Sequence, residues 1–208
     1  MTRTITRTFD NYSDAEAAVS ELERMGVPHS DISIIANNRD RAHGDRDYVN
    51  ESEAAEDAGK GASAGALLGG AGGLLAGLGV LAVPGLGPVV AAGWLASTLA
   101  GAGVGALVGG AAGGLVGALK NEGVDEDEAH VYAESVRRGG TLVSAKVDDG
   151  MAVRAEEVLQ SNRAVRAADR RAVYQEEGWS RFDENAPDYS EDDIARERAR
   201  YSGETTRL

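Results

Sequence analysis

The chain of 208 residues carries 34 acidic against 21 basic side chains, a formal net charge of −13, so most of its surface would repel the phosphates of a nucleic acid. It has no cysteine, which excludes disulfides, thiolate nucleophiles and cysteine zinc sites and fits a reducing cytosolic setting. The first residues lack the apolar run of a secretory signal.

Residues 1–36 predict the first β-α-β half of an α/β domain. Apolar and polar side chains alternate over residues 2–9, which indicates a strand, and the apolar run at 32–36 indicates a second one. The polar and charged residues 37–58 then form a linker.

The helix between these two strands has recognisable ends. Ser13 and Glu16 have the spacing of a capping box, so we expect the helix to begin at Ser13. Gly26 supplies a left-handed residue at its end, and Pro28 prevents its continuation.

Residues 121–169 predict the second half of the domain. The expected elements are a helix from the acids at 125–128 to the glycines at 139–140, a strand at 141–147, a helix capped by Asp148 or Asp149, and a strand at 164–169. Two such halves pair most economically as an α+β fold, a ferredoxin-like split βαβ sheet covered by helices on one face.

Residues 170–208 form an extended aromatic and acidic tail that is too polar to make a core of its own, and a short last helix is expected from Ser190. Trp179 and Phe182 are candidate contacts for an unknown protein partner. The alternative, that this segment is a strap across its own domain, is slightly favoured.

Residues 59–120 are the most unusual segment, because no charged residue occurs from position 61 to position 119. Glycines recur there in two series with a four-residue step: Gly61, Gly65, Gly69, Gly73 and Gly77, then Gly101, Gly105, Gly109, Gly113 and Gly117. On an α-helix each series forms a ridge that permits close helix–helix contact, the pattern of a glycine zipper. The turn residues Pro84, Gly85, Gly87 and Pro88 between the two series predict an antiparallel helical hairpin inserted in the domain.

Such a hairpin needs a partner. Interior glycine costs roughly 1 kcal/mol relative to alanine, so ten of them disfavour an isolated aqueous helix by about 10 kcal/mol. A lipid bilayer or packing against a second copy of the chain would offset this cost. We therefore expect self-association or membrane association, with the α/β domain in the cytoplasm and the hairpin at the inner membrane; the alternative is an entirely cytoplasmic protein.

The sequence predicts no catalytic residue, no cofactor and no metal site. The glycines lack the flanking residues of a phosphate-binding loop, the acids at 125–128 diverge around a helix, and the three histidines have no ligand-like spacing. No serine lies on a nucleophile turn.

Two segments resemble a known family. Residues 8–22, Thr-Phe-Asp-Asn-Tyr-Ser-Asp-Ala-Glu-Ala-Ala-Val-Ser-Glu-Leu, and 32–36, Ile-Ser-Ile-Ile-Ala, are similar to the N-terminal domain of the bacterial general stress (heat-induced stress) protein family, and the resemblance extends over about residues 2–168. It implies a stress-associated role and brings no catalytic residues. The expected function is a non-enzymatic general stress response protein, membrane-associated or self-associating through the zipper. The alternative is a soluble homo-oligomeric scaffold or interaction module assembled through the zipper.

Overall fold

The computed structural model describes residues 2–39, 79–105, 114–187 and 189–201, the side chains of 100–105 excepted. The strands are β1 (Thr2–Phe9), β2 (Ile32–Asn37), β3 (Gly79–Val83), β4 (Gly87–Gly93) and β5 (Thr141–Asp148). The helices are α1 (Tyr12–Arg24), a single 3₁₀ turn (His29–Asp31), α3 (Trp94–Gly105), α4 (Gly114–Asn121), α5 (Glu126–Arg137), α6 (Asp149–Ser161), α7 (Ala167–Glu176) and α8 (Glu191–Tyr201).

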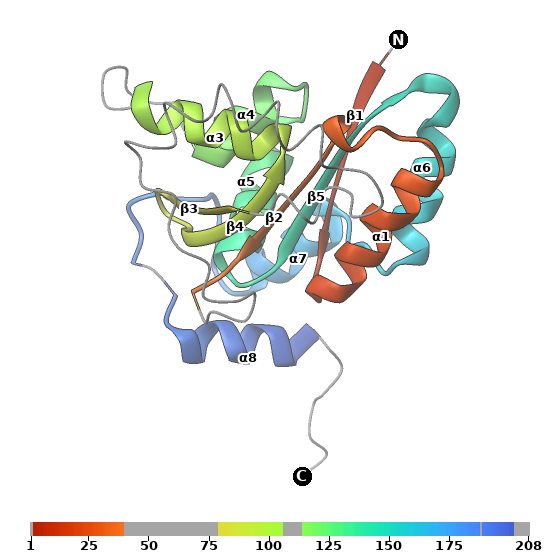
Figure 1. Cartoon of the computed structure of the whole chain (residues 1–208). Coiled ribbons are helices and arrows are strands. Elements are labelled where there is room, and N and C mark those ends of the chain that lie inside the picture. Colours follow the sequence, from red (N-terminus) through yellow and green to blue (C-terminus); the bar gives the residue numbers. More distant parts are fainter. Residues whose placement is uncertain (1, 40–78, 106–113, 188, 202–208) are drawn as a thin grey trace.

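The strands form one antiparallel sheet in the order β1-β5-β2-β4-β3 (Figure 1). Because β1 and β2 are both antiparallel to β5, they run parallel to each other with β5 inserted between them. This is a split βαβ unit, and the α+β class expected from the sequence is the class of the structure.

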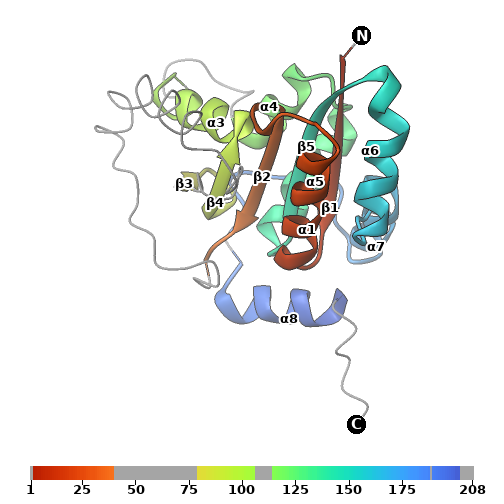
Figure 2. The same cartoon turned by 45° about the vertical axis from the view of Figure 1, so that its right-hand side comes forward.

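Helices cover both faces of the sheet, not one face as the sequence predicted (Figure 2). One face packs on α1 and α6 through side chains such as Phe9, Leu22 and Leu159. The opposite face packs on α3, α4, α5 and α7 through side chains such as Leu95, Leu119 and Tyr132. Helix α8 lies across one end of these layers.

The helical hairpin predicted for residues 59–120 is wrong over residues 79–93. These residues form the β-hairpin β3–β4, and β4 extends the sheet by pairing with β2. The reason is that Val80, Val83, Val89 and Val90 are β-branched residues that bury well on a pleated surface next to the already apolar β2, whereas an isolated glycine-rich helix has no such partner. The turn at Pro84–Pro88 joins two strands rather than two helices.

The chain leaves β4 and enters α3 at Gly93, which has a φ of +85°. A Cβ atom there would lie 2.0 Å from the carbonyl oxygen of Ile32, so only glycine fits. The buried hydroxyl of Ser33, on the neighbouring strand, accepts a 2.9 Å hydrogen bond from the backbone N–H of Leu95 and thereby satisfies a free amide in the first turn of α3.

Other helix ends are close to their predictions. Asp125 is the N-cap of α5 and accepts from the backbone N–H groups of Asp127 and Glu128 at 2.9 and 3.3 Å. Asp148 is the N-cap of α6, and the hydroxyl of Ser190 accepts from the N–H of Asp193 at the start of α8.

Two local predictions are corrected. The helix α1 begins at Tyr12 with Asn11 as its N-cap, so Ser13 already lies inside the first turn and does not cap it. The strand predicted at 164–169 is reduced to one bridge between Thr8 and Val165, because the helix-forming run from Ala167 starts α7 two residues later.

Candidate binding groove along the open edge of β1

The outer edge of β1 is nearly unpaired. Its inner edge pairs with β5, and its outer edge makes the single bridge in which Thr8 N–H donates to Val165 at 3.3 Å and Val165 N–H donates to Thr8 at 2.8 Å. Since outward-pointing backbone groups alternate along an antiparallel strand, those of Thr4 and Thr6 also face outward. The described residues supply no hydrogen-bond partner for the outward N–H and C=O of Thr4.

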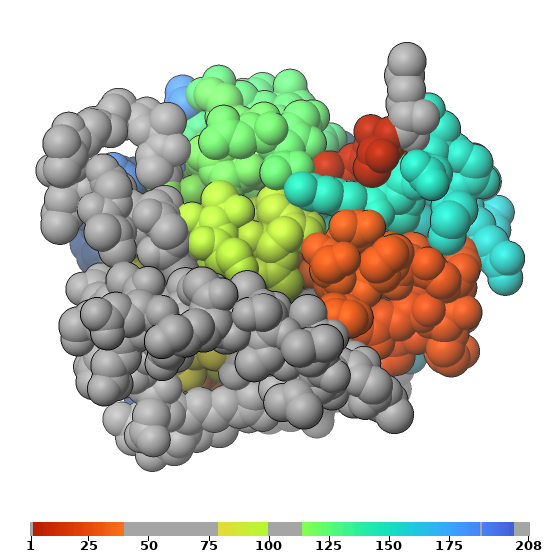
Figure 3. Space-filling model, turned by 45° about the horizontal axis from the view of Figure 1, so that its top comes forward, coloured from red at the N-terminus to blue at the C-terminus, as the bar shows by residue number. Residues whose placement is uncertain are grey.

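This open edge forms the floor of a groove of about 600 Å³. Residues 3–7 of β1 line its floor, the first two turns of α5 and the preceding loop line one wall, and α6 lines the other. Figure 3 shows the start of β1, in red, at the surface between the green segment that includes α4 and the teal-to-cyan segment that includes α6. We call this space the β1 groove.

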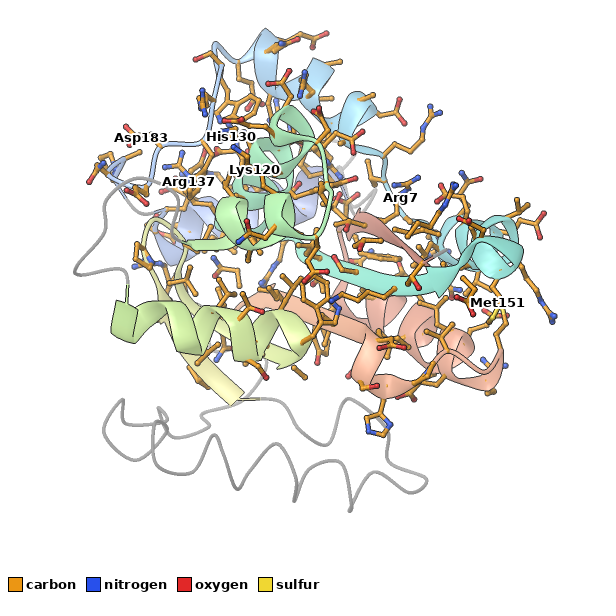
Figure 4. The ribbon with its side chains drawn as sticks, turned by 90° about the horizontal axis from the view of Figure 1, so that it is seen from above. Arg7, Lys120, His130, Arg137, Met151 and Asp183 are labelled. Carbon is orange, nitrogen blue, oxygen red and sulfur yellow. The ribbon has the colours of Figure 1, made fainter. Side chains whose placement is uncertain are left out.

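Two ion pairs fix the arginines of β1 against α6. Arg3 contacts Asp149 at 3.1 Å, and Arg7 contacts Glu156 at 2.5 Å, with Arg7 directed from β1 toward α6 in Figure 4. Burial alone would lower the pKa of Arg7, but its hydrogen bond to Glu156 and the nearby negative charge raise the pKa above the ordinary arginine value. Both cations are therefore already compensated by the chain itself.

The far end of the groove is closed by Tyr132. Its hydroxyl donates a 2.7 Å hydrogen bond to the carbonyl oxygen of Thr6, which also accepts from Arg7 at 2.6 Å. Burial, followed by the charge of Glu128, raises the pKa of Tyr132 well above its ordinary value, so the hydroxyl remains a donor throughout the physiological range.

The rim of the groove is acidic, with one apolar spot. Asp125 and Glu128 lie on the α5 wall and Glu157 lies on the α6 wall, and none of the three forms an ion pair within the described part of the chain. Val153 is 72% exposed on the α6 wall and is the one large apolar side chain so exposed among the described residues.

The main-chain groups on the floor of the groove suit the binding of an extended segment. Among the residues that the structure describes, no three metal-ligating side chains come together. The floor instead offers unpaired main-chain donors and acceptors, which are the groups that hold an added strand.

The predicted zipper residues lie only partly in the described ranges. Gly61, Gly65, Gly69, Gly73, Gly77, Gly109 and Gly113 fall outside them. Gly101 and Gly105 belong to α3, and Gly117 belongs to α4, so the helical part of the second series is split between two short helices. In the described residues no helix is both long enough and apolar enough to cross a membrane.

The tail packs on its own domain. Trp179 lies edge-on to Tyr174 with ring centroids 5.7 Å apart, and both Trp179 and Phe182 pack against the core. Arg181 pairs with Glu126 at 2.7 Å, and the segment that carries Asp183 runs past the side of α5 that carries His130 and Arg137 (Figure 4). Of the two alternatives for this segment, a contact for a partner or a strap across its own domain, the described residues have the strap arrangement.

An ionic and aromatic cluster then fastens α8 to the end of the sheet. The buried Arg138 contacts Glu134 at 2.7 Å and Glu177 at 2.5 Å, and Arg198 donates to the carbonyl oxygens of Gly139 and Asn37 at 2.9 and 3.2 Å. Although burial opposes it, hydrogen bonding to Arg138 and Arg200 lowers the pKa of Glu177. The cavity in this cluster is about 10 Å³, which leaves no room for a ligand beyond one water molecule.

The β1 groove was missed by sequence reasoning. The alternation of threonine with arginine and isoleucine over residues 2–8 is a signal for an edge strand, because such a strand buries one face and leaves polar groups at its border. The position of the groove depends, however, on the turn of the chain into α7.

Comparison with known proteins identifies one domain. Residues 4–82 match the model of the heat induced stress protein YflT domain, which spans most of β1, all of α1 and β2, and most of β3. No match was found among the curated proteins or the solved structures. The match is shorter than the resemblance expected over residues 2–168, but it supports the same family: residues 4–82 match a heat induced stress protein YflT domain.

Proposed function

We propose that this chain serves the stress response as a non-enzymatic binding protein that adds an extended polypeptide segment to the open edge of β1. The observation that carries the proposal is the outward backbone of Thr4 on the floor of the β1 groove, for which residues 2–39, 79–105, 114–187 and 189–201 supply no hydrogen-bond partner. The stress-response role rests on the YflT domain, whose family is not a known enzyme family.

Strand addition suits a protein that acts under heat. The affinity of strand addition comes mainly from main-chain hydrogen bonds, which any extended segment can supply whatever its sequence. Partly unfolded proteins expose such segments. The stretch Thr2–Thr6, where only the carbonyl of Thr6 is already taken, is long enough for a bound segment of about five residues, or about 17 Å at 3.4 Å per residue.

The bound segment would take the place of the strand that the sequence predicts at residues 164–169. Val165 occupies only the end of this position, opposite Thr8, before the chain departs into α7. A segment antiparallel to β1 would continue the line of Val165 opposite Thr6, Thr4 and Thr2, and would leave the interior pairings of the sheet unchanged.

Self-association is the second candidate. Gly101 and Gly105 lie in α3 at the four-residue spacing that permits close helix contact, and a second copy of the chain is the partner that such a ridge fits. A membrane anchor made of two long helices does not form part of the proposal, because residues 79–93 are strands.

The test uses an edge-blocking variant of the full chain. In Thr4→Pro the outward N–H is lost while the ladder to β5 is kept, since a proline is tolerated where its nitrogen faces outward from an edge strand. The matched control, Thr4→Val, keeps the N–H and the β-branched shape. The probe is a fluorescein-labelled seven-residue peptide of alternating threonine and valine, and its binding is followed by fluorescence anisotropy.

We expect Thr4→Val to bind the peptide as the wild type does and Thr4→Pro to bind it at least about tenfold more weakly, since a strand pair loses a hydrogen bond and meets a ring at its centre. In the wild type, amide hydrogen exchange at Thr4 and Thr6 should slow when peptide is added. Equal binding by Thr4→Pro, with its circular dichroism spectrum unchanged, would overturn the proposal.

Self-association has a separate measurement. Gly101→Leu should reduce the molar mass found by light scattering if α3 forms the contact, with Gly150→Leu, on α6 where a side chain meets open space, as the control. Identical molar masses for the wild type and Gly101→Leu would dismiss this candidate.

A further inference from the structure

We infer that the strand taken up by the β1 groove is a cationic one, a segment with lysine or arginine at alternate positions. The inference rests on the proposed function, which supplies the strand. It deepens that function by naming the chemistry of the partner.

The walls of the groove carry negative charge that the chain does not neutralise. The two arginines on the floor are taken by Asp149 and Glu156, so they cannot also compensate Asp125, Glu128 and Glu157. Three carboxylates therefore face the space above an edge strand with no cation of the described chain against them.

Three other cations at the α5 end are also engaged. Lys120 contacts Glu126 at 2.7 Å, Arg181 contacts the same carboxylate at 2.7 Å, and Arg171 contacts Asp127 at 3.2 Å. These pairs use the acids of α5 that lie outside the groove. Of the acids that line it, Glu156 pairs with Arg7 and Asp125 caps the start of α5, whereas Glu128 and Glu157 have no such partner among the described residues.

The placement of these acids matches the geometry of a strand. Successive side chains of a bound segment would point alternately toward the α5 wall and the α6 wall. Asp125 and Glu128 lie on the α5 wall, and Glu157 lies on the α6 wall together with the exposed Val153. Cationic side chains thus fit toward α5, and a mixture of apolar and cationic side chains fits toward α6.

The net charge of the whole chain also favours a cationic partner. At −13 the protein attracts cations over long range and repels anionic partners, including nucleic acids and acidic segments. Long-range attraction speeds the encounter, and the local carboxylates then select among the segments that arrive.

Three labelled peptides of identical length test the inference against the full-length chain. Each has seven residues with threonine and valine at five positions, and two alternate positions hold lysine, serine or glutamate. The paired variant is Glu128→Gln/Glu157→Gln. Its matched control is Glu176→Gln/Asp192→Asn, which removes two exposed acids on α7 and α8 outside the groove.

We expect the lysine peptide to bind about tenfold more tightly than the serine peptide at low salt, and the glutamate peptide to bind more weakly than either, because each exposed charge pair changes affinity severalfold. The difference should shrink as salt is added, since exposed charges are screened. The Glu128→Gln/Glu157→Gln variant should lose most of the preference, whereas the control variant should keep it.

The outcomes separate this inference from the proposed function. Equal affinity for the three peptides, with binding still lost in Thr4→Pro, would overturn the charge preference and leave strand addition standing. Failure of all three peptides to bind the wild type would overturn strand addition. Tight binding of the lysine peptide that survives Thr4→Pro would show charge attraction without strand pairing and would overturn both.

Discussion

The hydroxyl of Tyr132 on α5 donates a 2.7 Å hydrogen bond to the carbonyl oxygen of Thr6 on β1. This contact joins the helix of one wall of the β1 groove directly to the strand of its floor. It also satisfies an outward carbonyl at the point where the free part of the edge ends.

Replacing Tyr132 by phenylalanine should lower the free energy of unfolding by about 1 kcal/mol, because one buried hydrogen bond is lost while the Thr6 carbonyl keeps its bond from Arg7. Urea denaturation measures the difference. Tyr189→Phe, at a half-buried tyrosine of the tail, is the control and should change stability less. A Tyr132→Phe variant as stable as the wild type would mean that the bond contributes nothing net.

Stability should also fall in alkaline solution. Burial raises the pKa values of Tyr132 and Tyr174 above the ordinary value of 10.0. The unfolded chain therefore releases protons at a pH where the folded chain keeps them, so this contribution is complete below about pH 10 and declines as the pH rises above it. Urea titrations from about pH 9 to pH 11 should show the decline, and phenolate absorbance should show two tyrosines that ionise only with unfolding.

Substitution of Gly139 by alanine should release α8. Gly139 and Gly26 follow helices with the same φ of +99°, but a Cβ at Gly139 would lie 2.6 Å from the Cγ2 of the buried Ile194, whereas a Cβ at Gly26 meets open space. Gly26→Ala should cost about 1 kcal/mol from backbone strain alone. Gly139→Ala should cost more and should expose the tail to limited proteolysis after Arg196 or Arg198, a cleavage that Gly26→Ala should not permit.

Replacement of Glu134 by glutamine should be among the more destabilising single changes in α5. Its carboxylate is fully buried and accepts from Arg138 at 2.7 Å and from Arg137 at 3.1 Å, so the change leaves buried guanidinium groups undercompensated, at a cost of about 3 kcal/mol. Asp127→Asn, which breaks the exposed pair with Arg171, should cost less than about 1 kcal/mol. Thermal unfolding compares the two, and equal shifts in Tm would contradict the structural role given to Glu134.

The sequence predicts the elements whose signals are local. The alternation of residues 2–9, the acids at 125–128 and the glycines at 139–140 each determine an element within a few neighbouring residues, and β1, α5 and β5 form where these signals place them. The start of α1 lies one residue before the predicted one, and Asn11 occupies the N-cap position without a capping hydrogen bond from its side chain.

The secondary-structure predictions are wrong where the structure of a segment depends on a part of the chain that is distant in sequence. Counting glycines at four-residue steps favours a helix over 61–82, but residues 79–83 pair with β4, whose Val89 and Val90 pair with β2, some fifty residues earlier in the chain. Likewise, the β1 groove exists because the chain turns into α7 after Val165 instead of completing a strand. Neither choice is encoded in a short window of sequence, since both depend on which surface is already formed.

The β3–β4 hairpin has one further consequence. β2 is buried along its whole length. Without the hairpin, β2 would be an edge strand, and the sheet would have two long edge strands, β1 and β2, with unpaired backbone groups. A molecule with two different unpaired sheet edges can pair head to tail with further copies and form fibres. With the hairpin in place, the edge of the sheet opposite β1 is the five-residue β3 instead of β2, and a short edge strand offers less unpaired main chain to a second molecule.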